Sequence, residues 1–390
     1  MKGICLLALP ALALALAVPA PAQNAPSPAA PPLKWTDTVS LSGFLAGDAR
    51  WRRAGEGASA VTTTDLYLRA FELSVEADVR DWLQATAVIN SEYIGDALNA
   101  GDSTVVVDEA HLDIDVPHTP IYFVLGKRIQ PFGLFESYLV TDLLVQDLYE
   151  TKAVGLTAGL KAPGSTDISV TAYKGHIRSD HMAQSGLLGP EVPDLPEDPA
   201  ARVDSWIVSA LSSPIGDDWR ISAGLASEPG ALGRQTMFNV GSYLSFPFHE
   251  HLEFNAEFMK ALRRDPVPAA GRSFRESAFS VTAAYLLVTR EMKDQSGRNY
   301  RARKSRRLAH PAVLAVRFEA LDDDGRAEAL GAWSVKDRIC AGGRYTFYEH
   351  ENVEAALGFE YRRQSVRISP AFAGPTPSAH EFYLRFGLDF

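Results

Sequence analysis

The segment from Gln130 to Thr151 (QPFGLFESYLVTDLLVQDLYET) carries the residues whose types and spacing could do chemistry. It is unusually apolar for a chain connection, and it contains no lysine. We expect it to pack against another surface, because large apolar patches are rarely left bare in water. Packing of that kind would leave its carboxylates facing water, where they attract cations. These carboxylates are Glu136, Asp142, Asp147 and Glu150.

The sequence contains only weak indications of a catalytic site or a metal site. The stretch His249–His251 lacks the helical H-E-x-x-H spacing of a zinc site. His111 lies between Glu109 and Asp113 and could attract a cation, but a single histidine is more often solvated. No G-x-S-x-G motif occurs. We therefore predict no catalytic residue, no metal site and no cofactor, with a hydrolase as the alternative.

The elements that must position these charges are strands. From Phe382 to Phe390 every second residue is large and apolar, and the residues between are Tyr383, Arg385, Gly387 and Asp389. A period of two indicates a strand with one apolar and one polar face. Similar alternating segments recur from Val39 onward, and we count sixteen of them. Each is roughly 9–15 residues long, enough for a tilted strand to cross a membrane.

The connections between these segments alternate between short and long. The connections Arg80–Asp81 and Pro117–Pro120 are short. The connections that come before and after each of them along the chain are longer. Thr289–Ala309 breaks the alternation, because it is long and rich in arginine and lysine. We interpret it as a basic turn near anionic headgroups, with a periplasmic contact or an overlooked strand as alternatives.

Residues 1–22 read as a cleaved secretory signal, with Lys2, an apolar run from Ile4 to Val18, and small residues before Gln23. Residues 23–34 read as a flexible leader rich in proline and alanine. No later run of eighteen apolar residues occurs, so membrane-spanning helices are not expected. The formal net charge of -10 argues against a nucleic-acid partner.

These patterns predict an all-β fold for residues 35–390, a transmembrane antiparallel β-barrel of about sixteen strands. Short turns would be periplasmic and longer loops extracellular, which places the chain in the outer membrane of a Gram-negative bacterium, in contact with lipid and lipopolysaccharide. Two soluble β-domains are the alternative, but they do not explain the alternating connections. Loop 130–151 should then fold into the lumen as a constriction, unless it packs outside as a lid.

The polar faces of the predicted strands should line the lumen, and their charges are unevenly distributed. An acidic wall is formed by Glu72, Glu76, Glu109 and Asp113. A basic wall is formed by Arg50, Arg317, Lys336, Arg338, Arg344, Arg362 and Arg385. Opposed walls would create a transverse field that filters ions in an open pore. Mutual neutralisation across a plugged interior is the alternative. By the same parity Cys340 should face the lumen and accept labelling reagents.

Residues 124–156 resemble the siderophore porin family of the legiobactin-uptake type. The resemblance is carried by Gly126, Lys127, Pro131, Phe132, Gly133, Phe135, Glu136 and Ser137, followed by Leu148, Glu150 and Thr151. Phosphate-selective porins share a looser version of the motif around the Pro-Phe pair. The chain departs from the siderophore family in having no coiled-coil segment before the barrel and in carrying Asp142-Leu143 where members tend to have Asp-Pro.

The resemblance implies an outer-membrane porin, a TonB-independent channel through which small hydrophilic solutes diffuse, with ferric siderophores among the candidate solutes. An anion-selective (phosphate) porin and a loop-plugged binding or structural barrel are the alternatives. The terminal Phe390 matches the signal that the barrel assembly machinery reads. A homotrimer is a further expectation, because porins commonly associate in threes.

Overall fold

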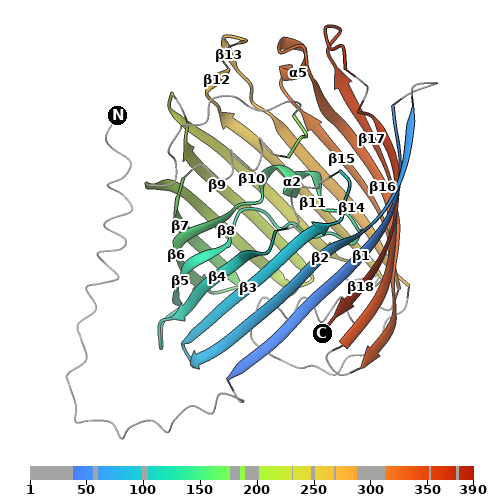
Figure 1. Ribbon diagram of the computed structural model, residues 1–390. Coiled ribbons are helices and arrows are strands. Elements are labelled where there is room, and N and C mark those ends of the chain that lie inside the picture. Colours follow the sequence, from blue (N-terminus) through green and yellow to red (C-terminus); the bar gives the residue numbers. More distant parts are fainter. Residues whose placement is uncertain are drawn as a thin grey trace, which may run out of the picture. The chain divides into compact units, whose positions relative to one another are not determined.

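A computed structural model describes residues 38–55, 60–98, 104–175, 185–188, 202–230, 232–246, 251–267, 269–287, 312–350, 353–374 and 377–390. One compact unit, Val39–Phe390, holds a closed antiparallel barrel in which every strand pairs with its neighbours (Figure 1). This finding confirms the predicted sixteen-stranded antiparallel barrel. The predicted signal, the leader and the basic connection 289–309 lie outside the described residues.

Chain order and spatial order agree around the whole barrel, apart from one small hairpin. The barrel strands are β1 (Val39–Ala54), β2 (Val61–Arg80), β3 (Leu83–Ile94), β4 (Val106–Asp115), β5 (Ile121–Ile129), β6 (Lys152–Ala162), β7 (Thr166–Lys174), β8 (Val203–Asp217), β9 (Trp219–Pro229), β10 (Arg234–Ser245), β11 (Leu252–Arg263), β14 (Ser277–Leu286), β15 (Ala312–Asp322), β16 (Trp333–His350), β17 (Val353–Ile368) and β18 (Ala379–Asp389). The hairpin β12 (Pro266–Val267) and β13 (Arg272–Ser273) and the helices α2 (Leu144–Tyr149) and α5 (Arg326–Ala329) belong to connections.

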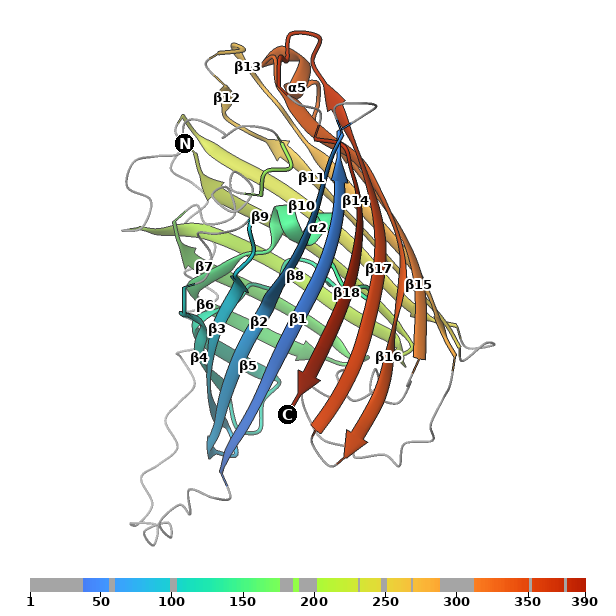
Figure 2. The same cartoon turned by 45° about the vertical axis from the view of Figure 1, so that its right-hand side comes forward.

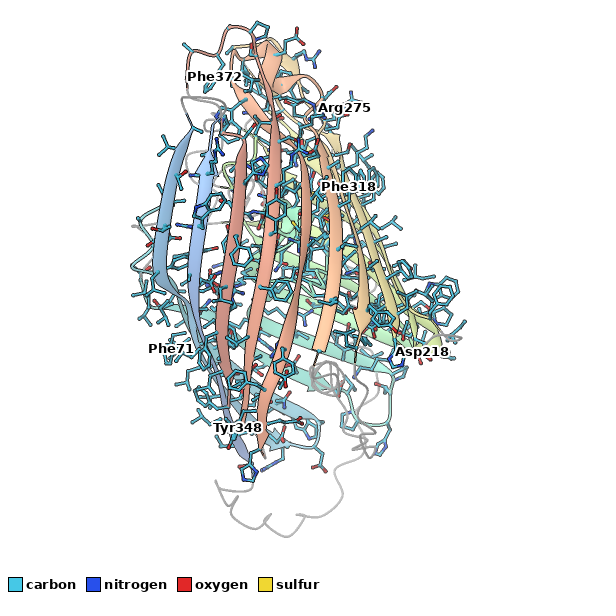
Figure 3. The ribbon with its side chains drawn as sticks, turned by 90° about the vertical axis from the view of Figure 1, so that its right-hand side faces the viewer. Phe71, Asp218, Arg275, Phe318, Tyr348 and Phe372 are labelled. Carbon is cyan, nitrogen blue, oxygen red and sulfur yellow. The ribbon has the colours of Figure 1, made fainter. Side chains whose placement is uncertain are left out.

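The alternation in the sequence becomes two faces of one sheet. Apolar side chains such as Phe71 and Phe318 point outward and are exposed, as Figure 3 shows. Similar exposed apolar residues occur on almost every barrel strand, for example Leu125, Val240 and Leu384. A continuous apolar belt of this kind is not stable in water and requires an apolar environment around it. In the described part of the chain no helix is long and apolar enough to span a membrane.

The two rims of the barrel differ in the length of their connections. One residue, Asp218, separates β8 from β9, whereas residues 130–151 separate β5 from β6. In Figure 3 Arg275 and Phe372 mark the rim with the longer connections, and Asp218 and Tyr348 mark the opposite rim. The helix α5 and the hairpin β12–β13 both lie at the rim with the longer connections (Figure 2). The predicted alternation of short turns and long loops is therefore present.

The barrel closes where β1 pairs with β18, in a register that runs from Phe44 opposite Asp389 to Ala54 opposite Ala379. The chain end continues this pairing, because the Gly43 N–H donates to the Phe390 carbonyl oxygen at 2.7 Å, and the Phe390 N–H donates back at 3.0 Å. The ring of Phe390 covers the space where Gly43 has no side chain. The final residue is thus part of the seam.

Gly43→Val is expected to destabilise the closed barrel. A Cβ at this position would overlap the Phe390 ring and lie 2.9 Å from the Glu72 carbonyl oxygen. Overpacking of this kind costs about 1–3 kcal/mol. Gly47→Ala on the same strand is the matched control, because its Cβ would meet nothing closer than 3.9 Å. The folded fraction after refolding in detergent, read from heat-modifiable gel mobility, measures both variants. Equal folded fractions would show that the contact at the seam is not limiting.

Candidate functional site

The connection between β5 and β6, residues 130–151, lies inside the barrel and forms the candidate constriction. The ends of this loop are held together, because the Gln130 N–H donates to the Thr151 carbonyl oxygen at 2.8 Å. The Gln130 side chain also donates to the Ala153 carbonyl oxygen at 2.7 Å. Its helix α2 is surrounded by strands in both ribbon views (Figures 1 and 2). The loop therefore starts and ends at one point of the wall and crosses the interior between.

Carboxylates of the opposite wall accept hydrogen bonds from backbone N–H groups of the loop. Loop backbone that leaves a sheet has unpaired donors, and a buried donor without an acceptor costs about 1–3 kcal/mol. Gly133, with a φ of 112°, lets the chain turn so that two successive N–H groups face one carboxylate. The pairs are Leu134 to Glu257 (2.7 Å), Phe135 to Glu257 (3.2 Å), Thr141 to Glu360 (2.7 Å) and Leu144 to Glu319 (2.6 Å).

Arginines of the wall complete the attachment by donating to carbonyl oxygens of the loop. Arg317 donates to the carbonyl oxygens of Thr141 (2.9 Å) and Asp142 (3.0 Å). Arg385 donates to the Val140 carbonyl oxygen at 2.7 Å. Both strands of origin, β15 and β18, lie across the barrel from the ends of the loop. Donors and acceptors of the wall together determine where the loop runs.

The helix α2 is anchored by apolar packing inside the barrel. Its residues Leu144, Val145, Leu148 and Tyr149 are at most 1% exposed. They pack against lumen-facing residues of several strands and against the connection between β7 and β8. These partners are Tyr173, Ile207, Ala226, Met237, Met259, Ala278, Leu321 and Val335 from the wall and Leu187 and Leu188 from the connection. One side of the lumen is thus filled at this level.

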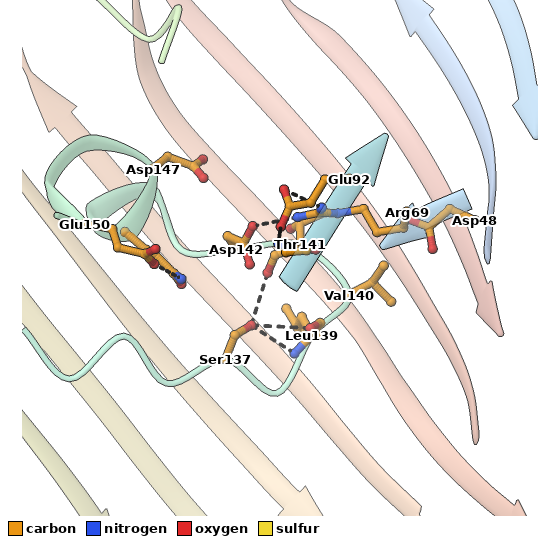
Figure 4. Close-up of polar contacts among 12 residues, drawn as sticks. Asp48, Arg69, Glu92, Ser137, Leu139, Val140, Thr141, Asp142, Asp147 and Glu150 are labelled. Carbon is orange, nitrogen blue, oxygen red and sulfur yellow. Dashed lines mark hydrogen bonds and ion pairs between the residues drawn. The ribbon is translucent and has the colours of Figure 1, made fainter. Parts of the chain in front are cut away.

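The carboxylates of the loop differ in their surroundings. Glu136 forms an ion pair with Arg220 at 2.5 Å, and Asp147 pairs with Arg338 at 2.7 Å. Glu150 accepts a hydrogen bond from Gln146 and lies 3.5 Å from Lys152. Asp142 stands at the loop tip beside Arg69 and Glu92, as Figure 4 shows, and its side chain is 44% exposed. Asp142 and Asp147 reach water to a larger extent than Glu136 and Glu150.

The predicted basic wall faces the lumen but is bound in ion pairs. All but one of its members have a carboxylate partner. The pairs are Arg50 with Asp96 (2.6 Å), Arg317 with Glu319 (3.3 Å), Arg338 with Asp147 (2.7 Å), Arg344 with Glu354 (2.5 Å), Arg362 with Glu381 and Arg385 with Asp48 (2.7 Å). These ion pairs favour the neutralised alternative for this part of the lumen, and the field between two opposed charged walls stays a prediction.

Lys336 departs from the predicted wall. It is the extra residue of a bulge in β16, where the pairing with β17 shifts between Val335 and Asp337. A bulge interrupts the regular alternation of faces. Lys336 is exposed, whereas Arg338, two residues on, is 4% exposed. Residues two apart normally face the same side of a sheet. Because of the bulge, Lys336 and Arg338 do not.

The predicted acidic wall occupies the strands β2 and β4, and β2 is the neighbour of β1, which carries Arg50. Glu72 and Glu76 on β2 pair in register with Asn90 and Thr86 on β3. On β4, Glu109 and Asp113 flank His111, whose ring nitrogens lie 3.6 Å and 3.2 Å from their carboxylates. Water reaches this wall at Glu109 and Asp113, whose side chains are 23% and 39% exposed.

Two functional residues escaped prediction because bulges place them. The pairing of β1 with β2 skips Arg69, and the pairing of β3 with β4 skips Asp108. Arg69 forms ion pairs with Glu92 (3.0 Å) and Asp142 (3.1 Å), and Asp108 pairs with Lys152 (2.8 Å). In the sequence Arg69 shares the parity of the lipid-facing Phe71. An arginine on a lipid-facing position is costly, and that anomaly is the signal that could have indicated the bulge.

Cys340 faces the lumen, as its parity predicted, but it is not accessible. Its side chain is fully buried and its Sγ lies 3.6 Å from Arg317 Nη2, beneath the loop. The expectation of a labelling target is therefore wrong, because the loop covers this part of the wall. Among the described residues no group of three or more His, Cys, Asp or Glu side chains is arranged to hold a metal ion.

Comparisons with known proteins support the fold. The OmpF porin of Salmonella typhi, in complex with daunomycin, has a TM-score of 0.60 at 11% identity, covering 92% of this chain and 99% of that one. The outer membrane channel DcaP of Acinetobacter baumannii has a TM-score of 0.57 at 13% identity, covering 90% and 97%. The anion-selective porin from Comamonas acidovorans also has a TM-score of 0.57, at 9% identity, covering 90% and 98%. The fold is that of outer-membrane porins.

Sequence comparison is less informative about the particular protein. A "UPF0422 protein" of Coxiella burnetii (strain RSA 493 / Nine Mile phase I) is 24% identical over 280 residues, which are 69% of this chain and 57% of that protein. This chain thus spans little more than half the length of that curated relative. No family model matches the chain. The resemblance to siderophore porins stays a prediction.

Proposed function

We propose that the protein is an outer-membrane channel through which small hydrophilic solutes diffuse along a water-filled lumen narrowed by loop 130–151. The supporting observation is the uneven burial of the lumen wall. Glu319 and Glu360, on β15 and β17, have side chains with no exposure, because the loop lies on them. Glu92 and Asp113, on β3 and β4, keep 37% and 39%. The passage follows the wall of β2–β4.

The apolar belt and the unequal rims support a membrane location for this channel. A barrel with an exposed apolar outer face and a charged interior is stable when lipid surrounds it and water fills it. Short turns would then face the periplasm, and the longer connections would face outward. The resemblance of residues 124–156 to siderophore porins would add metal chelates to the solutes. The absence of lysine from the loop argues against the phosphate-selective alternative.

A loop-plugged barrel is the second candidate, and one observation favours it. The apolar cluster around α2 resembles the core of a soluble domain, with Leu144 and Tyr149 fully buried inside the barrel. A filled half-lumen reduces the passage, and the loop tip already contacts β2 through the ion pair of Asp142 with Arg69. The two candidates differ in whether the folded protein conducts ions as it stands.

Single-channel recording in planar bilayers tests the proposal. The purified protein, shown to be folded by heat-modifiable gel mobility, is expected to give stepwise conductance in potassium chloride. Liposome swelling with sugars of increasing size would give the size limit of the passage. A boiled sample serves as the control for detergent artefacts. Folded protein that inserts and gives no conductance at any voltage would contradict an open channel and favour the plugged barrel.

A further inference from the structure

Lumen-facing charges of opposite sign differ in their access to water. Several cations of the β9–β18 half are buried. The side chains of Arg220, Arg317 and Arg338 are at most 5% exposed, whereas Arg344, which is paired with Glu354, is 39% exposed. Carboxylates of the β2–β4 wall and of the loop tip are wetted, and Asp142 and Asp113 are 44% and 39% exposed. A solute in water therefore meets these carboxylates but not Arg220, Arg317 or Arg338.

The buried arginines contribute little to the field in the passage, because their charges are neutralised at short range. Arg317 lies 3.3 Å from Glu319 and 3.7 Å from Glu360, and Arg385 lies 2.7 Å from Asp48. Such pairs act on a distant ion as dipoles, whose field falls off faster than that of a single charge. The sign of the field is therefore determined by the residues beside the water.

The loop tip meets the wall of β2 and β3 in a group of two carboxylates that share one cation. Arg69 lies 3.0 Å from Glu92 and 3.1 Å from Asp142, and its guanidinium stacks 4.2 Å from the ring centre of Tyr93. Figure 4 shows the three charged residues together at the tip of the loop. The group keeps one net negative charge, and its carboxylates are more exposed than the guanidinium between them.

A buried hydrogen-bond acceptor without a described partner lies next to this group. Asn90 is 5% exposed, and its Nδ2 donates to Glu92 at 3.0 Å. Among the described residues its Oδ1 has no hydrogen-bond partner, although a buried amide oxygen ordinarily has one. An unpaired oxygen beside a carboxylate is suited to a cation, or to an N–H donor of a cationic solute, and not to an anion. This observation does not depend on how many carboxylates and cations lie near the passage.

The remaining cations near the β2–β4 wall are fewer than the carboxylates there. Lys152 lies 2.8 Å from Asp108 and 3.5 Å from Glu150. Arg128 donates to the Thr157 hydroxyl at 3.4 Å. The carboxylates of the same wall and loop tip outnumber these cations together with Arg69. They are Glu72, Glu76, Glu92, Asp108, Glu109, Asp113, Asp142 and Glu150.

We propose that the passage selects cationic solutes over anions, and that Glu92, Asp113 and Asp142 are its specificity-determining residues. The inference rests on the proposed channel function, and it names the class of solute for that channel. Fixed carboxylates beside a narrow water path raise the local concentration of cations and exclude anions. Small organic cations such as amines fit the same chemistry and would find acceptors along the whole β2–β4 wall.

The reversal potential across a potassium chloride gradient tests the inference. The wild type is expected to favour potassium over chloride, most strongly at low salt, because the Debye length is about 10 Å at 0.1 M and shorter at higher concentration. The variant E92Q/D113N/D142N should lower the permeability ratio by about fivefold or more, since unit charges a few ångströms from a passing ion act strongly even in water. D81N, which removes an exposed carboxylate in the β2–β3 turn, is the matched control and should leave the ratio nearly unchanged.

A change of opposite sign strengthens the test. R69Q removes the cation between Glu92 and Asp142 and should raise the preference for potassium. A wild-type channel that prefers chloride or is indifferent would overturn the inference and leave the channel function standing. An unchanged ratio in the triple variant would overturn it as well. Absence of conductance in folded wild type contradicts the channel itself. If the triple variant does not fold, D142N alone, at the exposed loop tip, gives the deciding ratio.

Discussion

Removing loop 130–151 from the lumen is expected to raise single-channel conductance about twofold or more, because the loop narrows the water path. Pro131 can be joined to Glu150 by Gly-Ser-Gly, since the neighbouring Gln130 and Thr151 are already hydrogen-bonded at 2.8 Å. The deletion removes α2 and the loop tip with Asp142. The wall residues that now contact the loop carry charges of both signs, and water would hydrate them in the deletion variant. We therefore expect the strands to keep their pairing.

The same deletion should lower thermal stability, because the apolar cluster around α2 disappears. Replacing the tip of the β12–β13 hairpin, residues 269–271, by Gly-Ser-Gly is the control for the inserted Gly-Ser-Gly sequence in a connection outside the lumen. That variant should conduct like the wild type. Conductance that does not change on deletion would show that the loop does not limit the path. A silent wild type with a conducting deletion variant would establish the plugged barrel.

The outline of the fold follows from the sequence because strand alternation is a local property. Parity alone predicts Arg317, Arg338, Arg362 and Arg385 on one face of the sheet. In the structure each of them forms an ion pair, and their role as a pore wall stays a prediction. Their partners could not be predicted in the same way. Asp48 and Arg385 are 337 residues apart, and they meet only because closure brings β18 beside β1 in one particular register.

Bulges limit the prediction of the site more than any other feature. A bulge shifts parity by one residue, and nothing in the alternation announces it. Arg69, Asp108 and Lys336 are the three positions where the actual register departs from the simple pattern. Two of these residues hold the loop or its end by ion pairs. The position at which the loop meets the wall is therefore determined by bulges, which the alternation of apolar and polar residues does not reveal.

The apolar content of the loop predicted that it would be buried, but not against which wall. Burial of Leu144 and Leu148 requires apolar or small residues opposite, and the lumen offers Met237, Met259 and Ala278 on β10, β11 and β14. Backbone donors of the loop required acceptors as well, and Glu257 and similar residues supply them. In the sequence these glutamates read simply as charges of an acidic lumen. Their role as acceptors for the loop becomes visible only with the loop in place.

Arg317→Met is expected to destabilise the folded barrel by about 3–5 kcal/mol, because it leaves buried carboxylates without their cation. Glu319 and Glu360 have fully buried side chains beside Arg317. The loop also loses the bonds from Arg317 to the carbonyl oxygens of Thr141 and Asp142. Arg272→Met is the matched control. Arg272 and its partner Asp324 are 53% and 46% exposed, and an ion pair so accessible to water contributes about 0–1 kcal/mol.

Urea unfolding in micelles, followed by tryptophan fluorescence, measures both losses. The combination R317M/E319Q/E360Q should recover much of the stability, because neutral amides remove the uncompensated charge while their oxygens still accept from Leu144 and Thr141. Equal losses for R317M and R272M would contradict the assignment of Arg317 as the buried support of the loop. Recovery in the triple variant together with normal conductance would separate the two roles of this wall. Its charges would then stabilise the position of the loop, while the wetted carboxylates opposite would act on the solute.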